Sequence, residues 1–526
     1  MMKRISVISA MLTLCGGIAF SQGQLDAFKY GQTDLSGTAR YMSMGGAFGA
    51  LGGDVSVMSA NPAGLAVYRS SEVGATLGLS SANTQTDWLG TMESNNKKRT
   101  NFDNIAYVGY FPTANDVGVV SWNAGFSYNR LKNFHRDYTM SSGRDIHTSL
   151  TDYIAARATG NDYDIDGAND PYMLPDWLSV LGYNAGLIEA FNDNSHSYYS
   201  SFGAADRNGE WVPSQIDNAG LRISERGAID QYNIAFGINL SDRVFLGADL
   251  AVTDIDYSFS SQYDEKFQND DDFFIDNRLS TEGSGYSVNV GAIVHPADFL
   301  RLGVAYNSPT WYKMTDYFYG AAASSVTMDN NKNNDLTDNT PEGQFYEYRY
   351  RSPDKWLLSA AIILGRSALI SVDYELANYK GMRMYDRYGD AEQSTNNDIN
   401  ANFNRSTTVR AGAEVKLTPQ FALRAGGSWS GSSMTEALRN GKVEVATAGT
   451  IPHFTLDRGV TNYTFGFGYR FTPSFYTDLA CVLTTSKEDV HVFSNLFDKE
   501  GALFETQPAS LKTNRIHTAL TVGYKF

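Results

Sequence analysis

The sequence holds one group of carboxylates at the spacing of metal ligands. Asp162, Asp164 and Asp166 alternate along the chain and are followed by Gly167, which reproduces the first half of a calcium-binding loop. Such a loop needs a bidentate glutamate at its twelfth position, and that position is Met173 here. The pattern therefore leaves two readings open, a weak calcium site in an outer loop or a hydrated acidic loop. We expect no other cofactor.

No other arrangement of reactive side chains indicates catalysis. The seven histidines show no His-Glu-x-x-His spacing, and the chain has neither a Gly-x-Ser-x-Gly elbow nor a Cys-x-x-Cys-His haem motif. Gly46, Gly49 and Gly52 are not followed by Gly-Lys-Ser/Thr, which a phosphate-binding loop requires. We therefore expect no enzyme, although Ser, His and Asp on separate strands could meet without leaving a motif.

The charge of the chain restricts its partners. The formal net charge is −16, which repels nucleic acid. The acidic excess is concentrated in runs such as 264–272 and 329–338, which we expect to be hydrated loops. An aromatic content of 13% with 48 glycines is typical of a barrel with aromatic girdles and tight turns.

The first residues form an export signal. Lys3 and Arg4 precede an apolar stretch from Ile5 to Phe20, and the small residue Ser21 stands before Gln22 as a cleavage position. We expect residues 1–21 to be a signal peptide. Beyond it, no apolar run reaches the roughly 18 residues of a membrane-spanning helix.

The rest of the chain alternates between apolar and polar residues. In the last thirteen residues, 514–526, Leu520, Val522, Tyr524 and Phe526 share one face of an extended strand, opposite Thr521 and Lys525. We interpret the terminal Tyr524 and Phe526 as a signal for barrel assembly. In an exported chain, repeated strands of this kind predict an outer-membrane β-barrel whose apolar faces meet lipid.

Fourteen strands are expected, an even number as a closed antiparallel barrel of this bacterial kind requires. Their predicted ranges are 73–81, 102–111, 117–130, 229–240, 243–258, 286–295, 299–312, 354–364, 367–379, 405–416, 420–430, 461–471, 474–484 and 513–526. Short turns containing Pro, Asp or Gly alternate with long outer loops, the largest at about 131–228. Residues 73–526 would thus form the barrel.

Several charged side chains lie on strand faces that cannot meet lipid. A charge on the lipid face at mid-depth costs roughly 2–4 kcal/mol, so the charged face of a strand must point into the lumen or lie near an interface. The residues predicted to point inward are Asp249, Asp373, Glu375, Arg410, Glu414, Arg424 and Asp478.

Residues 22–72 do not alternate and are rich in glycine, which predicts a compact element packed inside the lumen. The stretch 37–48, Gly-Thr-Ala-Arg-Tyr-Met-Ser-Met-Gly-Gly-Ala-Phe, followed by Gly53-Asp54 and by Asn61-Pro62-Ala63-Gly64-Leu65, resembles the N-terminal hatch of FadL-type outer-membrane transporters, especially forms found in Bacteroidetes. The resemblance extends over the whole chain, from the signal to the terminal aromatic residue.

The resemblance implies a monomeric barrel plugged by the hatch, in which Asn61, Pro62, Ala63 and Gly64 help to gate passage. It also implies that long-chain fatty acids or other hydrophobic molecules enter from the outer loops and leave sideways beside a kink in the third strand. Gly125 is our candidate for that kink, since glycine within a strand often marks a bulge; it could equally accommodate an aromatic neighbour.

The large second loop contains an amphipathic stretch that is predicted to be helical. Trp177, Leu178, Leu181, Ile188 and Phe191 fall roughly on one stripe. The stripe is either an external hydrophobic docking site or the core of a folded loop.

The sequence therefore predicts passive, hatch-gated uptake of a hydrophobic small molecule across the bacterial outer membrane. Long-chain fatty acids are the expected substrate. The expected partners are this small molecule, outer-membrane lipid and lipopolysaccharide, and the barrel-assembly machinery. Two alternatives stay open: a general porin, and a surface receptor or adhesin, including a haem receptor, carried by the long outer loops.

Overall fold

A computed structural model describes residues 23–143, 146–191, 196–205, 211–328, 332–497, 502–504 and 506–526. The predicted signal peptide, residues 1–21, lies outside these ranges. None of the described helices is long and apolar enough to cross a bilayer.

The main body is one closed antiparallel wall. Its sheet contains 19 strands, of which fourteen complete the circle. The circle closes because β25 (Ala509–Lys525) pairs with β1 (Glu72–Trp88), from Ser510↔Asp87 to Lys525↔Glu72. The other wall strands are β2 (Thr91–Pro112), β3 (Val119–Asn133), β9 (Ile216–Leu240), β10 (Val244–Phe267), β11 (Asp272–Ala297), β12 (Leu300–Asn307), β16 (Lys355–Leu364), β17 (Ala368–Asn378), β19 (Arg405–Lys416), β20 (Phe421–Ser430), β21 (Phe454–Arg470) and β22 (Phe475–His491). All fourteen predicted strands are confirmed.

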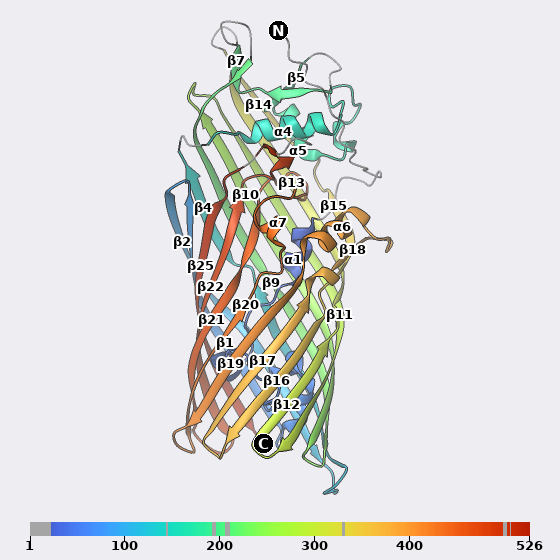
Figure 1. Cartoon of the computed structure of the whole chain (residues 1–526), viewed down its shortest axis with the longest axis vertical. Coiled ribbons are helices and arrows are strands. Elements are labelled where there is room, and N and C mark those ends of the chain that lie inside the picture. Colours follow the sequence, from blue (N-terminus) through green and yellow to red (C-terminus); the bar gives the residue numbers. More distant parts are fainter. Residues whose placement is uncertain are drawn as a thin grey trace.

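The two ends of the barrel differ. The short turns and the C-terminus lie at one end, which we call the lower end (Figure 1). The long connections lie at the opposite end, which we call the outer end. Five further strands extend the wall at the outer end, namely β4 (Arg136–Ser142), β13 (Trp311–Met328), β14 (Lys332–Asn339), β15 (Phe345–Arg351) and β18 (Arg383–Asp386).

The outer connections are more regular than the sequence indicated. The β1–β2 hairpin closes at a two-residue turn, Leu89-Gly90, and the β10–β11 hairpin closes between Phe267 and Asp272. The predicted loop at 264–272 is therefore mostly strand and tight turn, and 332–338 of the second acidic run belongs to β14. The two predicted loops were wrong because the outer extensions of the strands expose polar residues, and the predicted strands were those with an apolar outward face.

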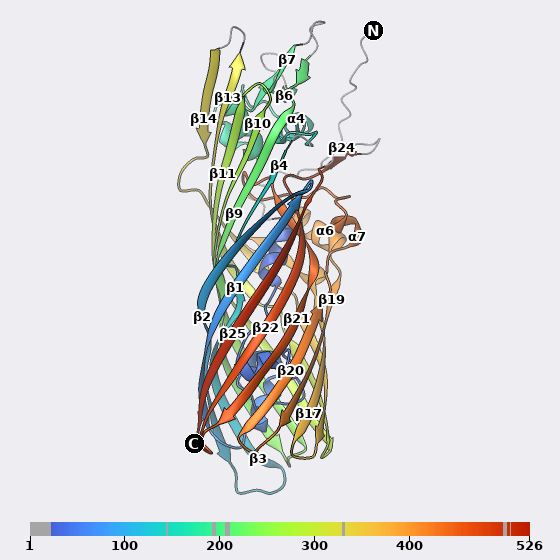
Figure 2. The same ribbon diagram turned by 90° about the vertical axis from the view of Figure 1, so that its left-hand side faces the viewer.

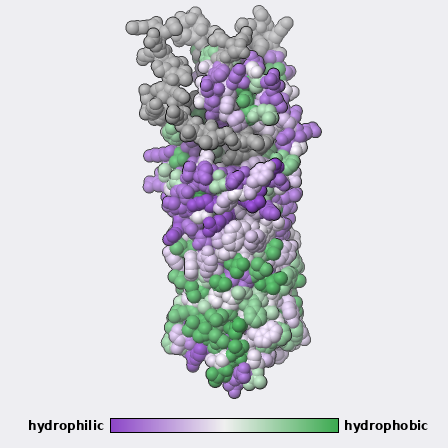
Figure 3. Space-filling model, turned by 90° about the vertical axis from the view of Figure 1, so that its right-hand side faces the viewer, coloured by the Kyte–Doolittle hydropathy of each residue, from purple (hydrophilic) through white to green (hydrophobic). Residues whose placement is uncertain are grey.

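A band of apolar side chains covers the outside of the lower half (Figure 3). On β10, Leu246, Leu250 and Val252 are 43–48% exposed, and equivalent residues on the other strands complete the band. Aromatic rings line both margins of the band: Phe111 stacks on Trp122 near the lower end with ring centroids 4.0 Å apart, and Phe102 stacks on Tyr128 at the upper margin. The rings of the terminal Tyr524 and Phe526 lie at the lower margin of the band, with their centroids 6.2 Å apart.

The second outer connection folds into a small domain above the barrel. It contains α4 (Leu150–Gly160), η2 (Pro171–Met173), α5 (Trp177–Asn184), β5 (Ile188–Ala190), β6 (Tyr198–Ser200), β7 (Gly203–Ala205) and β8 (Trp211–Pro213). The predicted loop at 131–228 is too long at both ends, because β3 and β4 occupy its start and β9 begins at Ile216. Other outer connections carry η3 (Tyr379–Gly381), α6 (Gln393–Asn402), α7 (Glu436–Arg439), β23 (Leu496–Phe497) and β24 (Ala502–Phe504).

The segment that precedes β1 lies inside the wall (Figures 1 and 2). Its helix α1 (Gln24–Gly31) lies about halfway up, and α2 (Ala39–Ser43), α3 (Val57–Ala60) and η1 (Pro62–Val67) lie lower, within the apolar band. We call residues 37–68 the plug.

Candidate functional site

The plug is packed against the inner wall on several sides. Four separate apolar clusters join it to the barrel; in two of them Met58 packs with Val108 and Ala235, and Ala63 packs with Phe245 and Ile293. The remaining clusters join Met44 and Phe48 to Ala361, and Met42 to Ala480. The plug therefore has no large core of its own and is stabilised by contact with the wall.

Glycines on the inner wall allow this contact. A Cβ added at Gly247 would stand 2.3 Å from the backbone carbon of Pro62, and one at Gly303 would stand 2.3 Å from the carbonyl oxygen of Gly49. Any side chain at these positions would displace the plug backbone. Eight wall strands each provide a glycine whose added Cβ would stand within 2.8 Å of a plug atom: Gly125, Gly237, Gly247, Gly291, Gly303, Gly412, Gly426 and Gly466. We call these the contact glycines.

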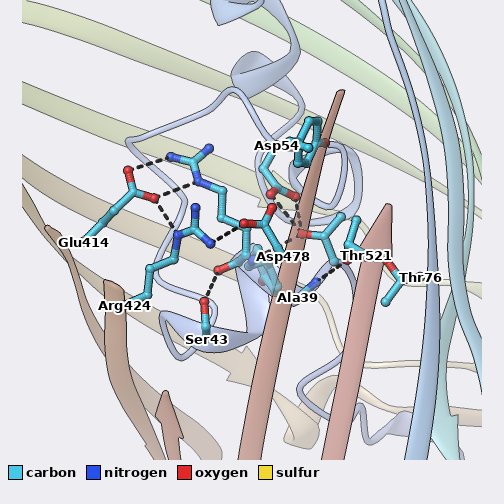
Figure 4. Close-up of polar contacts among 12 residues, drawn as sticks. Ala39, Ser43, Asp54, Thr76, Glu414, Arg424, Asp478 and Thr521 are labelled. Carbon is cyan, nitrogen blue, oxygen red and sulfur yellow. Dashed lines mark hydrogen bonds and ion pairs between the residues drawn. The ribbon is translucent and has the colours of Figure 1, made fainter. Parts of the chain in front are cut away.

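A chain of buried ion pairs ties the plug to three strands (Figure 4). Arg40 of α2 donates from Nε to Glu414 Oε2 at 3.0 Å, and Arg424 donates to the same oxygen at 2.6 Å. Arg424 Nη1 also donates to Asp478 at 2.5 Å. Burial lowers the pKa of Arg40, but Glu414 and Asp54 outweigh this effect and raise the pKa above its usual value. The predicted inward direction of Glu414, Arg424 and Asp478 is therefore confirmed.

Neutral hydrogen bonds extend this attachment around the bore. The Ala39 amide donates to Thr521 Oγ1 at 2.7 Å, and Thr521 bonds Thr76 at 2.7 Å on the neighbouring strand (Figure 4). On the opposite wall, the Gly49 amide donates to Asp373 at 2.9 Å. Strands from the end and from the middle of the barrel sequence therefore hold the plug.

The predicted gate element, Asn61 to Gly64, lies in the part of the plug that packs against β10 and β11. Asn61 is fully buried and caps η1, because its Oδ1 accepts from the Ala63 amide at 3.1 Å. Its Nδ2 donates to the Gly49 carbonyl at 2.6 Å, and the Gly64 carbonyl accepts from the Gly53 amide at 3.1 Å. Pro62 occupies the first position of η1, where its missing N–H costs nothing. The element thus joins two loops of the plug.

The third strand separates from the second partway up the wall. The β2–β3 ladder ends at Asn104↔Asn129, although both strands continue. Each strand has a bulge at this level, since the register skips Asp103 on β2 and Leu131 on β3. Above the ladder, the N-terminal segment takes up freed groups of β3: the Asp34 amide donates to the Leu131 carbonyl at 2.8 Å, and Ser36 Oγ donates to the Arg130 carbonyl.

The prediction that Gly125 marks a kink was wrong. Gly125 pairs with Val108 and Ala235 without a register shift. It is instead a contact glycine, since an added Cβ would stand 2.8 Å from Met58 Cε. The irregularity lies near Leu131, which no glycine signals in the sequence.

Two cavities lie above the plug. The lower one has a volume of about 310 Å³ and reaches the separated part of β2 and β3, where Asp103, Asn129 and Leu131 line it. Tyr41 and Ser59 of the plug region also line it, and burial raises the pKa of Tyr41 to about 12. The upper cavity has a volume of about 210 Å³ and lies between α1 and the outer loops.

The amphipathic stretch of the second loop is not an exposed docking site. Trp177, Leu178, Leu181 and Ile188 are all at most 4% exposed, and only Phe191, at 58%, faces solvent. The first four pack within the loop domain or against β13 and β14, because a helix held over the barrel mouth has apolar neighbours on most sides. The alternative, that the stripe is the core of a folded loop, is confirmed for these four.

The carboxylates of the calcium candidate point to separate partners. Asp162 bonds His196 at 2.9 Å, and Asp164 accepts from the Gly167 amide at 2.8 Å in a tight turn. Asp166 interacts with Tyr183. Among the residues placed in the structure, no group of three or more His, Cys, Asp or Glu side chains is arranged to hold a metal. The calcium site is unsupported by this geometry.

Arg40 and the contact glycines were not recognised from the sequence as site residues. The glycines carry a signal that could have been read, because each occupies an inward position in a strand at a similar height. Arg40 carries none, since the carboxylate that pairs with it, Glu414, follows it by 374 residues.

No protein-family model and no curated protein matches the sequence significantly. A FadL homologue from Pseudomonas aeruginosa has a similar structure: it is 12% identical, the match covers 94% of this chain and 100% of that one, and the TM-score is 0.51. The toluene transporters TodX of P. putida and TbuX of Ralstonia pickettii are each 12% identical, with 94% of this chain and 99% of theirs covered and TM-scores of 0.49 and 0.46.

The wall, the apolar band and the internal segment define a bacterial outer-membrane β-barrel filled by its own N-terminus. Within that class, the chain has the fold of the FadL homologue. At this level of identity the likeness establishes the fold alone.

Proposed function

We propose that the protein is an outer-membrane channel for the passive uptake of hydrophobic small molecules. The observation that carries this proposal is the plug, because it fills the lower bore and leaves the cavities above it next to the separated strands β2 and β3. A solute in the lumen would then leave sideways at the upper margin of the apolar band, where the separated strands lie, instead of passing straight through. No nucleotide or redox cofactor is required.

The separated strands suit such an exit. Where β2 and β3 are paired, opening the wall would break backbone hydrogen bonds in hydrocarbon, each of which costs several kcal/mol. Above Asn104 and Asn129 this ladder is already absent, and the N-terminal residues 34–36 bond the free edge of β3. A shift of that segment would therefore expose the gap without breaking the wall.

A crosslink across the gap tests the exit. Asn133 donates to Asn101 at 3.1 Å in the gap, and Asn104 donates to Asn129 at 2.6 Å in the intact ladder. In a Cys481→Ser background, we expect a short bis-thiol crosslink between Asn101→Cys and Asn133→Cys to slow the uptake of a fluorescent long-chain fatty acid into liposomes. The Tyr107→Cys and Phe126→Cys pair, whose positions are opposite each other in the intact ladder and line neither cavity, is the matched control and should leave uptake unchanged. Equal uptake for both crosslinked pairs would reject the lateral path.

The gate role of Asn61 to Gly64 is part of the same proposal. Because Asn61 joins η1 to Gly49, Asn61→Ala should loosen the plug and alter uptake while the barrel still assembles. Pro62→Ala should act in the same direction. If both variants take up fatty acid at the wild-type rate, the element has no gating role.

A general porin would behave differently. It requires an open aqueous bore, so a large and persistent single-channel conductance of the wild-type protein would defeat the proposal. A receptor or adhesin role for the second loop predicts that deletion of residues 146–213 abolishes surface attachment and spares uptake. Long-chain fatty acids are the first substrate to test, since the sequence resemblance implies them.

A further inference from the structure

The upper cavity differs from the lower one in its lining. Aromatic and aliphatic side chains make up much of its wall, and the chain around it is contributed by α1, β9, β10, β11 and the segment before β21. The apolar side chains that line it include Phe28, Phe134, Phe259, Leu279, Ile451 and Phe454. We call this cavity the upper chamber.

One buried polar group in this lining has no partner. His453 is 4% exposed, it lines the upper chamber, and neither of its ring nitrogens has a hydrogen-bond partner among the described residues. Its ring packs near Phe259, with centroids 5.7 Å apart. A buried polar group without a partner costs about 1–3 kcal/mol, so a ligand that bonds this ring recovers free energy.

The His453 ring is neutral. Burial lowers the pKa of His453 to about 3, and the positive charge of Lys29 acts in the same direction. A neutral imidazole has one N–H donor and one acceptor nitrogen, so it can bond a hydroxyl group in either sense.

The charged side chains around the chamber already have partners. Lys29 lies 3.6 Å from Asp26, and Arg515 lies 2.9 Å from Asp34. Arg136 is paired with both Glu225 and Glu488, and Lys132 donates to Gln32 at 2.6 Å. Lys132 bonds only uncharged oxygens, those of Gln32 and of the Lys29 carbonyl. The chamber is nevertheless lined by five carboxylates, Asp26, Asp34, Glu225, Asp457 and Glu488, and by only four cations, Lys29, Lys132, Arg136 and Arg515. An entering carboxylate would therefore lose its water without meeting a surplus of positive charge, which is unfavourable.

The size of the chamber limits the ligand. An engineered protein cavity of about 150 Å³ lined by aliphatic and aromatic residues binds benzene. At about 210 Å³, the upper chamber has room for a substituted single ring or a short chain.

We propose that the upper chamber binds a neutral amphiphile, with a single ring or short aliphatic body and one hydroxyl group, and that His453 is the residue that recognises the hydroxyl. This inference rests on the proposed function, since the chamber lies above the path into the lower cavity. It narrows the substrate class from hydrophobic molecules in general to uncharged ones, and it disfavours the fatty-acid anion at this position.

Calorimetry on the full chain in lipid nanodiscs tests the proposal with three matched probes: para-propylphenol, propylbenzene and para-propylbenzoate. We expect the phenol to bind most tightly and the benzoate most weakly. His453→Phe keeps the ring and removes the nitrogens, so it should weaken phenol binding about 10-fold, as for the loss of one buried hydrogen bond, and leave propylbenzene unchanged. His453→Gln, which can still bond a hydroxyl, should restore most of the phenol affinity.

His491 offers a matched control. It is 3% exposed, its ring nitrogens are also unpartnered within the described part of the chain, and it stacks on Phe454 at 5.0 Å without lining the chamber. His491→Phe should leave phenol binding unchanged. An equal loss in both variants, equal binding of phenol and benzoate by the wild type, or no loss in His453→Phe would each overturn the proposal.

The proposed channel function and the proposed ligand of the upper chamber can be rejected independently. His453-dependent binding of the phenol without any uptake into liposomes would leave the chamber standing and reject the channel. Uptake that treats the phenol and the benzoate alike would reject the chamber and leave the channel standing.

Discussion

The lower and outer halves of the barrel use the same alternation of residues with opposite polarity. On lower β10, Leu250 and Val252 face outward while Asp249 and Thr253 are buried inside. Farther up the same strand, Asp254, Asp256 and Ser258 face outward while Ile255, Tyr257 and Phe259 are buried. The backbone continues without a bulge on its β11 side, so only the solvent outside the wall changes.

The neighbouring strand β9 changes the polarity of its two faces in the same way. On β9, Tyr232, Ile234 and Phe236 face outward in the lower half, whereas Leu221 and Ile223 are buried in the outer half. The lower half, which meets lipid, therefore has an apolar exterior and a polar lumen, whereas the outer half, which meets water, has a polar exterior and an apolar core. It also places the outer margin of the membrane near Asp254.

The largest expected effect tests the core of the outer half. Phe273 is 1% exposed and packs 5.4 Å from Phe202, while its neighbour Phe274 faces outward and is 38% exposed. Phe273→Ala should reduce the stability of the outer half by about 3–5 kcal/mol, measured by hydrogen exchange of the loop domain in nanodiscs. Phe274→Ala is the control and should have little effect. Equal effects would mean that the outer half has no apolar core.

A charge placed outside the wall tests the level at which polarity changes. Leu250→Arg puts a cation in the apolar band and should cost about 2–4 kcal/mol in reversible urea unfolding from vesicles. Ser258→Arg makes the same change on the same face of β10 in the outer half, and it should be close to neutral. A similar cost at both positions would contradict the assigned margin.

A contact glycine tests how the lower half holds the plug. A Cβ added at Gly291 would stand 1.9 Å from Asn61 Oδ1, so Gly291→Ala should displace the gate element at a cost of about 1–3 kcal/mol. Gly74→Ala is the control, because its Cβ would meet only ordinary contacts at 3.6 Å. Faster hydrogen exchange at the Ala63 amide in Gly291→Ala alone is the expected result. Unchanged exchange there would show that the plug does not depend on this glycine.

The last expected effect is a dependence on pH in the outer half. Glu265 lies on outer β10, above the apolar band, and bonds Ser149 and the Leu150 amide at the start of α4. Burial raises the pKa of Glu265 to about 7, so folding takes up a proton. Stability is therefore highest below the unfolded pKa and falls as the pH rises to 7, by at most about 1.4 kcal/mol per pH unit.

Hydrogen exchange of α4 at pH 5 and pH 8 measures this effect, with stronger protection expected at pH 5. Glu265→Gln removes the titrating group and should remove the difference. If the difference persists in that variant, another group causes it.

The lower half was predictable from the sequence and the outer half was not. Alternation with an apolar outward face identified all fourteen wall strands, because lipid imposes that pattern on each of them. The upper part of β10, from Phe259 to Phe267, alternates equally well and lay outside the predicted strand 243–258, because its polar outward face resembles a hydrated loop. The inward charges such as Glu414 followed from the cost of a charge in lipid, whereas their pairing with Arg40 depends on closure of the wall.

The attachment of the plug also constrains the order of assembly. Arg40 precedes Glu414 by 374 residues and the Ala39 amide precedes Thr521 by 482, so the plug completes these bonds only when β25 is in place. During biogenesis the plug can therefore form these hydrogen bonds and ion pairs only after the wall strands that bind it have folded. Complete docking of the plug therefore requires a closed wall, and a barrel truncated before β25 would be open along one seam and would lack the Thr521 attachment of the plug.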